Sequence, residues 1–320
     1  MIRAGIIGGA GYTAGELLRL LINHPEVEVA FVHSTSNAGA PVTDVHEGLV
    51  GDTVLTFSES YDLTSCDVLF LCQGHGFSRK FWEENAMPEG LKVIDLAQDY
   101  RDESDGYIYG LPEVKRDAIK HCSRLANPGC FATAIQLALL PLAAAGRLQG
   151  EVHVTGITGS TGAGVKPGST THFSWRNNNI SVYKAFEHQH LKEIRQTLSS
   201  LQGGKDPEIS FIPVRGDFAR GIFVMADITT DMTAEEATRL YKDFYADAEF
   251  THVSDRPVDL KQVVNTNKCV ISLEKHGDKL LLLSVIDNLL KGASGQAVQN
   301  MNIMFGLPER TGLALKPSAF

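Results

Sequence analysis

A glycine-rich turn near the amino terminus constrains the fold of this chain more than any other feature of its sequence. The segment "RAGIIG" is an apolar run of strand length, and an amphipathic helical pattern follows from Thr13 to Asn23. Between them lie Gly8 and Gly11, spaced as in a variant of the dinucleotide fingerprint. Such glycines make a tight turn and let the backbone approach a pyrophosphate, at which the N–H groups of the first helical turn, including Tyr12 and Thr13, are directed. A purely structural turn is the alternative, but the position at the first strand-to-helix junction favours a nucleotide site.

The remaining apolar patterns divide the chain into two parts with different arrangements of strands and helices. In the first part "EVEVAFV", "DVLFLC" and "LKVIDL" alternate with helical patterns, which predicts an α/β Rossmann-type, doubly wound parallel sheet. From Glu151 onward the strands are longer, as in "EVHVTGIT", "EISFIPV" and "KLLLLSVID". Helices are expected from Glu187 to Leu201 and from Ala234 to Tyr245, and a further helical pattern ends the chain. This second part is typical of an α+β domain on an antiparallel or mixed sheet.

Charge and cysteine content exclude several classes of function. The net charge is −9, with 38 acidic against 29 basic residues, so the chain has no general attraction for nucleic acid or anionic membranes. Its longest apolar stretch, "FATAIQLALLPLAAAG", is shorter than the roughly 20 residues that span a bilayer. The five cysteines show neither paired spacing nor a nearby histidine pattern, which argues against disulfides and against a metal site. These features predict a cytoplasmic protein that binds no metal.

The residues after the second strand indicate which dinucleotide is bound. An Asp or Glu usually accepts the ribose 2′-hydroxyl of NAD there. Here "VHSTSNAG" offers Ser34 and Ser36, and the next carboxylate is that of Asp44. Hydroxyl groups donate to a 2′-phosphate without repelling it. The sequence therefore favours NADP(H) over NAD.

Cys130 lies at a corner whose features activate a thiol. In "RLANPGCFAT" a short strand ends at Asn127, and Pro128 and Gly129 form a turn before an apolar helix. A cysteine in the first helical turn is close to unpaired N–H groups and to the positive end of the helix dipole, which stabilise its thiolate. A thiolate beside a nicotinamide has one natural use: it forms a thioester with an acyl group, and hydride passes to or from that adduct. The alternative reading, a small buried hydrophobe, suits the other four cysteines better.

The segment "KAFEHQHLKEI" supplies a general acid and base for this chemistry. His188 and His190 both stand at the start of the helix predicted from Glu187, and their spacing of two directs them to different sides. The ordinary pKa of histidine lies near neutrality, which suits a group that must both take and give a proton. Because a residue deeper in the helix is held more rigidly, we favour His190 over His188.

Several other residues could contact the cofactor or the substrate. The loop "GITGSTGAG", with Ser160 and Gly162, could be flexible or could present backbone donors to a phosphate. Asn288 stands before a helix that begins with small residues. An acyl phosphate that also carries a carboxylate requires cationic, bidentate donors, and the candidates are arginines. They are Arg101, Arg215 and Arg220.

Motifs along nearly the whole chain resemble those of one family. They are similar to the motifs of the N-acetyl-gamma-glutamyl-phosphate reductases, which act in arginine biosynthesis and are related to the aspartate-semialdehyde dehydrogenases. The matching blocks are "GGAGYTAGELLRLL", "YGLPE", "NPGCFAT", "GSTGAG", "EHQHLKEI" and "DNLLKGASGQAVQNMN". The resemblance implies NADPH-dependent reduction of N-acetyl-L-glutamyl 5-phosphate to the 5-semialdehyde, with release of phosphate. It also implies a nucleotide-binding domain of residues 1–128 with 290–320, a catalytic and dimerisation domain of residues 129–289, and a homodimer or homotetramer.

The resemblance also assigns roles to individual residues. Cys130 would be the nucleophile, and the pair His188 and His190 would contain the acid and base. Arg220, the arginine of "RGI", would help to hold the substrate, and Arg101 stays a further candidate from its residue type. Taken together, the glycine turn, the residues after the second strand and the motifs give ten candidate cofactor-binding residues: Gly8, Gly11, Tyr12, Thr13, Ser34, Ser36, Gly74, Ser160, Gly162 and Asn288.

Other functions remain open at this point. The acyl group can be succinyl instead of acetyl, and an aspartyl or aminoadipyl phosphate can replace the glutamyl one. The protein can also be a nucleotide-binding sensor without catalytic turnover, but this hypothesis gives Cys130 and the two histidines no catalytic role. A cysteine hydrolase would leave the glycine-rich nucleotide site unused.

Overall fold

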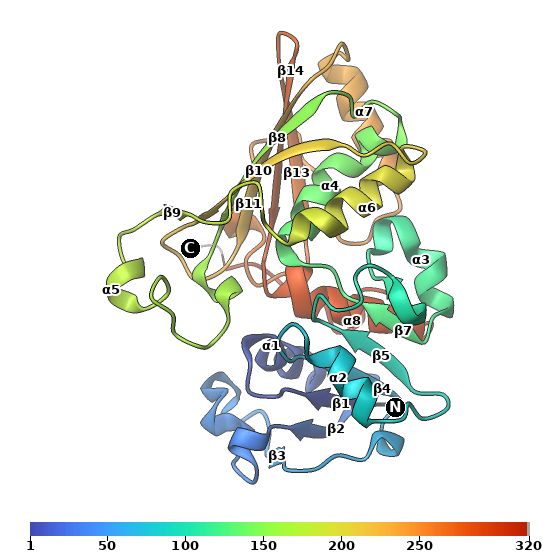
Figure 1. Cartoon of the computed structure of the whole chain (residues 1–320), viewed down its shortest axis with the longest axis vertical. Helices are drawn as coiled ribbons and strands as arrows, with labels where there is room; N and C mark the ends of the chain where they lie inside the picture. Colours follow the sequence, from blue (N-terminus) through green and yellow to red (C-terminus); the bar gives the residue numbers. More distant parts are fainter. Residues whose placement is uncertain (319–320) are drawn as a thin grey trace. The chain divides into compact units, whose positions relative to one another are not determined.

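The protein forms two compact units, and one of them is built from two separated stretches of chain. The computed structural model describes residues 1–318. Unit 1 comprises Met1–Pro128 and Ala293–Ala314, and unit 2 comprises residues 129–292 together with residues 315–318. Ala319 and Phe320, at the end of the predicted nucleotide-binding domain, lie outside the described residues. Figure 1 shows the chain coloured along its sequence.

Unit 1 contains a parallel sheet of the predicted Rossmann type. The seven strands lie in the order β3-β2-β1-β4-β5-β7-β6, and each neighbouring pair is parallel. The strands are β1 (Ile2–Ile7), β2 (Val27–His33), β3 (Phe57–Ser58), β4 (Val68–Leu71), β5 (Lys92–Asp95), β6 (Ile108–Tyr109) and β7 (Arg124–Ala126). The predicted α/β fold class is therefore confirmed.

Within residues 1–318, unit 1 has four α-helices, and one of them comes from the second stretch of chain. They are α1 (Tyr12–Leu21), α2 (Phe77–Glu84), α3 (Pro112–His121) and α8 (Gly295–Met304). Every residue of α8 is buried, and the helix packs on α1 and α3. Its Asn300 side chain donates to the carbonyl of Gly110 (2.9 Å). The carboxy-terminal helix therefore completes the core of this unit.

Unit 2 contains a mixed sheet with its longer helices on one face. Its strand order is β12-β13-β14-β11-β8-β10-β9; the pairs β8/β10 and β12/β13 are parallel, and the others are antiparallel. The strands are β8 (Glu151–Thr158), β9 (Ser181–Val182), β10 (Glu208–Arg215), β11 (Ile222–Thr229), β12 (Thr251–Val253), β13 (Cys269–His276) and β14 (Lys279–Ile286). The helices are α4 (Cys130–Ala144), α5 (Phe173–Arg176), α6 (His190–Leu201) and α7 (Ala234–Phe244). This mixed sheet confirms the expected α+β part.

The helix α4 forms the centre of unit 2. Thirteen of its residues, Phe131 to Ala143, are buried, and it packs against α6, α7, β11 and β14. Figure 1 shows α4, α6 and α7 together beside the sheet, whereas the segment with α5 and β9 extends from the other side. Because α4 is apolar all round, it is a core helix, and its first residue, Cys130, is fixed by packing along its whole length.

Two predicted helix starts differ from the structure. The first helix runs from Tyr12 to Leu21 instead of from Thr13 to Asn23. The helix expected from Glu187 begins at His190, so that His188 precedes it. Glu187 instead closes a turn, in which its N–H donates to the carbonyl of Lys184 (3.2 Å) and both Lys184 and Phe186 have positive φ. The prediction that both histidines lie inside the helix start was therefore wrong for His188.

Candidate active site

The turn that carries Cys130 has the geometry of an open helix start. Gly129 is the N-cap of α4 with extended backbone (φ −70°, ψ 152°), and no side chain caps the helix. The Gly129 carbonyl accepts the amide N–H of Thr133 (2.8 Å) and its hydroxyl (3.1 Å). Cys130 is half-buried, whereas Cys66 and Cys269 are buried. Its thiol therefore stands at the positive end of a long buried helix.

The carboxylate of Glu193 joins this turn to the histidine pair. Its Oε2 accepts the N–H of Gly129 (3.0 Å), and its Oε1 lies 3.9 Å from Nε2 of His190. Glu193 is 5% exposed, and a buried carboxylate requires such partners. One side chain thus touches both the backbone beside the nucleophile and the candidate base.

The two histidines have different surroundings. His188 accepts the N–H of His190 at its Nδ1 (3.3 Å), so its proton is on Nε2 in the neutral form. Burial, and to a smaller extent the charge of Lys184, lowers the pKa of His188 to about 4. Three aromatic rings surround it at 5.5 to 5.8 Å, those of Phe131, Tyr183 and Phe211. His188 is therefore neutral at physiological pH, and His190, whose ring centroid is 4.6 Å away, is beside Glu193.

Two further residues at this site are Tyr183 and Arg215. The Arg215 guanidinium lies 4.5 Å from the centroid of the Tyr183 ring. The pKa of the Tyr183 hydroxyl is raised, first by burial and then by the negative charge of Cys130, while Arg215 acts in the opposite direction. The negative charge of a Cys130 thiolate therefore acts on the Tyr183 hydroxyl.

The two arginines expected to hold substrate make strong contacts within the protein. Arg220 forms a bidentate ion pair with Asp287, with Nε and Nη2 at 3.0 and 3.1 Å from its oxygens. The Asp287 side chain is fully buried. Arg101 is 7% exposed and donates to the carbonyls of Asn127 (2.9 Å) and Leu96 (3.1 Å). Arg101 therefore supports the strand end that leads to the cysteine turn.

The glycine turn of unit 1 has an open backbone surface. Gly8 has φ +84°, which favours glycine, and a Cβ there would lie 2.6 Å from the Gln73 side chain. At Gly11, the N-cap of α1, a Cβ would meet nothing nearer than 3.9 Å. His46 donates from Nε2 to the Gly9 carbonyl (2.7 Å) and holds the turn in place. Tyr12 and Thr13 form the first turn of α1, as expected.

Two serines form a polar cluster after β2. The Asn37 amide donates to the Oγ atoms of Ser34 (3.1 Å) and Ser36 (2.9 Å). The two Oγ atoms are 3.5 Å apart, so one hydroxyl can donate to the other, and the second hydroxyl keeps its proton for another acceptor. Gly74 follows β4 at the same edge of the sheet and is exposed.

The other predicted cofactor residues belong to unit 2 and contact one another through one loop. Ser160 and Gly162 lie in a short 3-10 turn, Ser160–Ala163. Asn288 accepts the Gly221 N–H at its Oδ1 (2.7 Å) and donates to the Thr161 hydroxyl (3.0 Å). The structure thus brings Asn288 to the Ser160 turn, as well as the histidine pair to the cysteine turn.

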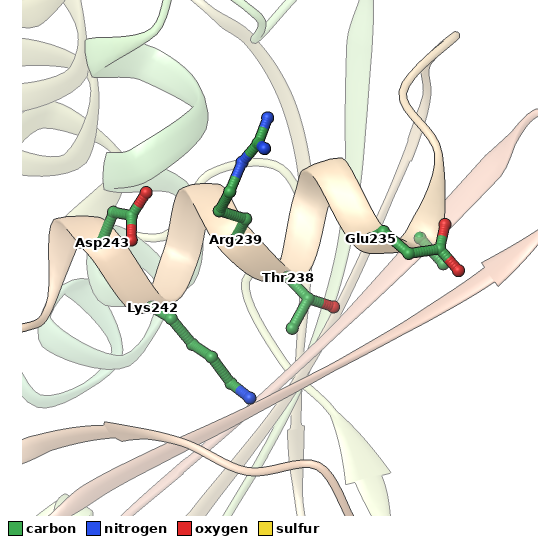
Figure 2. A pocket seen from close by; sticks show the side chains of 6 residues that line it. Glu235, Thr238, Arg239, Lys242 and Asp243 are labelled. Carbon is green, nitrogen blue, oxygen red and sulfur yellow. The ribbon is translucent and has the colours of Figure 1, made fainter.

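A shallow hollow on α7 is separate from these residues. It is lined by Ala234, Glu235, Thr238, Arg239, Lys242 and Asp243. Figure 2 shows that these side chains come from one helix. No cysteine or histidine lines it, and within residues 1–318 no three His, Cys, Asp or Glu residues gather as a metal site would require. None of the helices in this part of the chain has the length and hydropathy needed to cross a membrane.

Comparison with known families decides the class of protein. Residues 3–122 match the semialdehyde dehydrogenase NAD-binding domain, and residues 130–288 match the semialdehyde dehydrogenase dimerisation domain. The chain belongs to the semialdehyde dehydrogenase family. It is 63% identical to the N-acetyl-gamma-glutamyl-phosphate reductase of Bacteroides thetaiotaomicron and 54% identical to that of Christiangramia forsetii, over 100% of both chains in each case. The resemblance inferred from the motifs is confirmed.

Solved structures of the family share the fold. Aspartate semialdehyde dehydrogenase II of Vibrio cholerae, complexed with ASA, has a TM-score of 0.75 at 17% identity, covering 96% of this chain and 98% of that one. The enzyme of Francisella tularensis has a TM-score of 0.72 at 17% identity, covering 95% and 100%. At this identity the likeness concerns the fold.

The family assignment makes the chain an oxidoreductase with a nicotinamide cofactor, and the residues of unit 1 fit such a cofactor. The open side of Gly11 leaves room for a pyrophosphate beside the first turn of α1. The glycine turn therefore lies in the NAD-binding domain of the family, as a nucleotide site predicted from the sequence would. Sequence reasoning missed Glu193, Tyr183 and His46. Only Glu193 left a signal, since it stands three residues after His190 in the same helical turn.

Proposed function

We propose that this protein reduces N-acetyl-L-glutamyl 5-phosphate to N-acetyl-L-glutamate 5-semialdehyde with NADPH, releasing phosphate, as a step of arginine biosynthesis. The observation that carries the proposal is the contact of one carboxylate, that of Glu193, with both the Cys130 turn and His190. It occurs in a chain 63% identical to an N-acetyl-gamma-glutamyl-phosphate reductase. Unit 1 is proposed to bind the dinucleotide, and unit 2 to carry the chemistry and the contacts between subunits.

The proposed reaction begins at Cys130. Its thiolate attacks the acyl carbon, the bond from that carbon to the phosphate oxygen breaks, and a thioester remains on the sulfur. Bound NADPH supplies the hydride that reduces this thioester. Collapse of the resulting oxyanion breaks the carbon–sulfur bond, which releases the aldehyde and restores the thiolate. The helix start of α4 favours the thiolate at both ends of this sequence.

His190 is proposed as the group that moves protons in this reaction. It takes the proton of the Cys130 thiol and returns a proton to the leaving phosphate, while Glu193 stabilises its charged form. His188 is less suited to this role, because its pKa of about 4 leaves it unprotonated throughout the working range. We assign His188 to positioning His190 through the hydrogen bond to its amide.

NADP(H) is proposed as the preferred cofactor. Ser34 and Ser36 offer hydroxyl donors at the end of β2, where an enzyme that uses NAD has a carboxylate. The other proposed contacts to the cofactor are those of Gly8, Gly11, Tyr12, Thr13, Gly74, Ser160, Gly162 and Asn288. Arg101 and Arg220 remain proposed substrate residues, although both also have the structural contacts described above.

We propose that the protein works as a homodimer or homotetramer in the cytoplasm, where reducing conditions keep Cys130 a thiol. The segment 164–186 supports self-association, because it exposes several large apolar side chains. They are Val165, Phe173, Trp175, Ile180, Val182 and Phe186. The residues that match the dimerisation domain, 130–288, include this segment.

A spectrophotometric assay in the oxidative direction tests the proposed function. The purified protein is mixed with phosphate, NADP or NAD, and N-acetyl-glutamate, N-succinyl-glutamate or aspartate semialdehyde. We expect phosphate-dependent reduction of NADP with an N-acyl-glutamate semialdehyde. Turnover of aspartate semialdehyde alone, or equal use of NAD, would contradict the substrate or the cofactor assignment respectively.

A second experiment tests the nucleophile. Mass spectrometry of the enzyme mixed with acyl phosphate, in the absence of NADPH, is expected to show an adduct on Cys130. The Cys130→Ser variant should carry none. An adduct on Cys72 or Cys269 in the unaltered enzyme would refute the assignment.

A further inference from the structure

One imidazole ring lies against the glycine turn of unit 1. Nε2 of His46 donates to the carbonyl of Gly9 (2.7 Å). The same ring also lies against the start of α1, because a Cβ added to Gly15 would be 2.7 Å from Nδ1 and 2.9 Å from Cε1 of His46. The imidazole therefore contacts both the turn and the helix that follows it.

The segment that carries His46 is held within unit 1 by its own contacts. His46 lies between two short 3-10 turns. Its N–H donates to the carbonyl of Val42 (2.9 Å), its carbonyl accepts the N–H of Leu49 (2.9 Å), and both of these apolar side chains are buried. The centroid of its ring lies 6.2 Å from that of Phe57 on β3. The position of the imidazole is therefore set by the fold of unit 1.

The hydrogen bond from His46 sets the direction of one backbone donor. A peptide bond is planar and trans, so its C=O and its N–H point to opposite sides. Because the carbonyl of Gly9 faces the imidazole, the N–H of Ala10, which belongs to the same peptide, points away from it. In the described part of the chain this N–H has no hydrogen-bond acceptor. It is therefore a free donor just before the first turn of α1, whose own N–H groups a helix leaves unpaired.

We propose that His46 is a positioning residue for the cofactor, which turns the Gly9–Ala10 peptide so that its N–H donates to the pyrophosphate. The inference rests on the proposed function, since it requires a dinucleotide at this turn. Hydrogen bonds from backbone N–H groups to phosphate oxygens are charge-assisted, and a donor that is already oriented binds without a cost of reorganisation. Gly15 has a matching role, because a side chain there would displace the imidazole.

The affinities of His46→Leu for two ligands test the proposal. NADPH contains the pyrophosphate, whereas adenosine 2′-phosphate carries the adenosine and the 2′-phosphate without it. We expect the dissociation constant of NADPH, measured by fluorescence titration, to rise about 10 to 100-fold, because a charge-assisted hydrogen bond loses its orientation. The dissociation constant of adenosine 2′-phosphate, measured by calorimetry, should stay the same. His46→Gln, whose amide can donate to the same carbonyl, should retain most of the affinity for NADPH.

A double-mutant cycle tests the contact between His46 and Gly15. Gly15→Ala alone should weaken the binding of NADPH, because its methyl group displaces the imidazole. In the background of His46→Ala the same substitution should have little further effect, since the ring is no longer there. Gly48→Ala is the control, because a methyl group two residues after His46 has open space around it. Additive effects of Gly15→Ala and His46→Ala would show that the two residues do not act together.

The choice of ligands separates positioning from a general structural role. Equal weakening of both ligands by His46→Leu would mean that the residue supports the fold of unit 1 alone, and an unchanged affinity for NADPH would mean that the turn keeps its shape without it. Either result overturns the proposal. If His46→Leu does not fold, as judged by thermal unfolding, His46→Asn takes its place, because its shorter side chain cannot reach the Gly9 carbonyl.

Binding is measured without turnover, so this test is independent of the proposed reaction. An enzyme that reduced none of the acyl phosphates would refute the proposed function, yet a selective loss of NADPH binding in His46→Leu would still support the role of His46. If the unaltered enzyme prefers NAD, the proposed NADP(H) preference fails. NADH and AMP then provide the same comparison, with and without the pyrophosphate.

Discussion

His188 and His190 are two residues apart, but their environments give them different chemistry. His190 contacts a carboxylate, whereas His188 is enclosed by aromatic rings. We expect His190→Asn to lower kcat by about 10² to 10⁴-fold and to leave the affinity for NADPH nearly unchanged. His188→Asn should have a much smaller effect on kcat. Steady-state kinetics from pH 6 to 9 check this, and near-normal turnover of both variants would rule out a histidine base.

The buried, neutral state of His188 also makes stability depend on pH. In the unfolded chain this histidine takes up a proton as the pH falls through about 6.5, but in the folded protein it does so only near pH 4. The folded state therefore loses up to about 3 kcal/mol relative to the unfolded state between these values, and the loss is absent above pH 6.5.

The variant His188→Gln removes this titration. We expect the difference in unfolding free energy between the unaltered protein and His188→Gln to shrink as the pH falls from 7 toward 4. Denaturant titrations at several pH values measure it. His276→Gln, at an exposed position, is the control and should show no such trend. A difference that stays constant would show that His188 titrates normally.

The serine cluster after β2 gives a prediction for cofactor choice. Ser34 is 6% exposed, so Asp at this position would place a negative charge beside the expected 2′-phosphate with little solvent screening. We expect Ser34→Asp to raise KM for NADP about 10 to 100-fold and to raise KM for NAD much less. Ser34→Ala, which removes only a hydroxyl, is the control. Equal effects on the two cofactors would contradict the proposed contact.

At the scale of secondary-structure elements, a π-helical segment fixes the position of the cysteine turn. Leu290–Ser294 forms this segment, and a Cβ added to Gly292 would lie 2.8 Å from Cβ of Cys130. Real Cβ atoms do not approach each other so closely. The contacted atoms are Cβ and the backbone Cα of Cys130, not the far end of a flexible side chain that could move aside. Position 292 must therefore be a glycine if Cys130, the first residue of α4, is to keep its place.

We expect Gly292→Ala to displace Cys130 and to lower kcat by about 10 to 100-fold. The rate at which iodoacetamide alkylates Cys130 should change in parallel. Gly48→Ala is the matched control, because a Cβ at Gly48 meets no atom within 4 Å. Unchanged kcat in Gly292→Ala, with Cys130 alkylated at the normal rate, would mean that the segment does not position the nucleophile.

The sequence predicted those features that depend on neighbouring residues. The glycine turn, the helix that begins at Cys130 and the alternation of strands and helices all follow from local patterns. The partners of Glu193 and Arg215 could not be predicted in this way. Gly129 is 64 residues from Glu193 in the sequence, and Arg215 meets Tyr183 through the pairing of β10 with β9. Such contacts arise only when the tertiary fold brings distant elements together.

At the scale of the whole molecule, the exposed segment 164–186 predicts self-association. Phe173 is 79% exposed and Trp175 is 44% exposed. We expect Phe173→Ser to raise the dissociation constant of the oligomer about tenfold or more, because aromatic side chains dominate protein interfaces. Val54→Ser, at a position 98% exposed in unit 1, is the control. Identical sedimentation profiles for the two variants at every concentration would place the interface elsewhere.

The division of unit 1 between two stretches of chain has a consequence for how the protein is made. A ribosome releases Met1–Pro128 early, but it releases Ala293–Ala314 only after the whole of the intervening chain. Until α8 emerges, the surfaces of α1 and α3 that it covers are bare, and the carbonyl of Gly110 lacks its donor. Domains generally fold in the order of their synthesis. In this protein, however, residues 129–292 of unit 2 are synthesised before α8, so they can complete the packing around α4 while unit 1 still lacks its last helix.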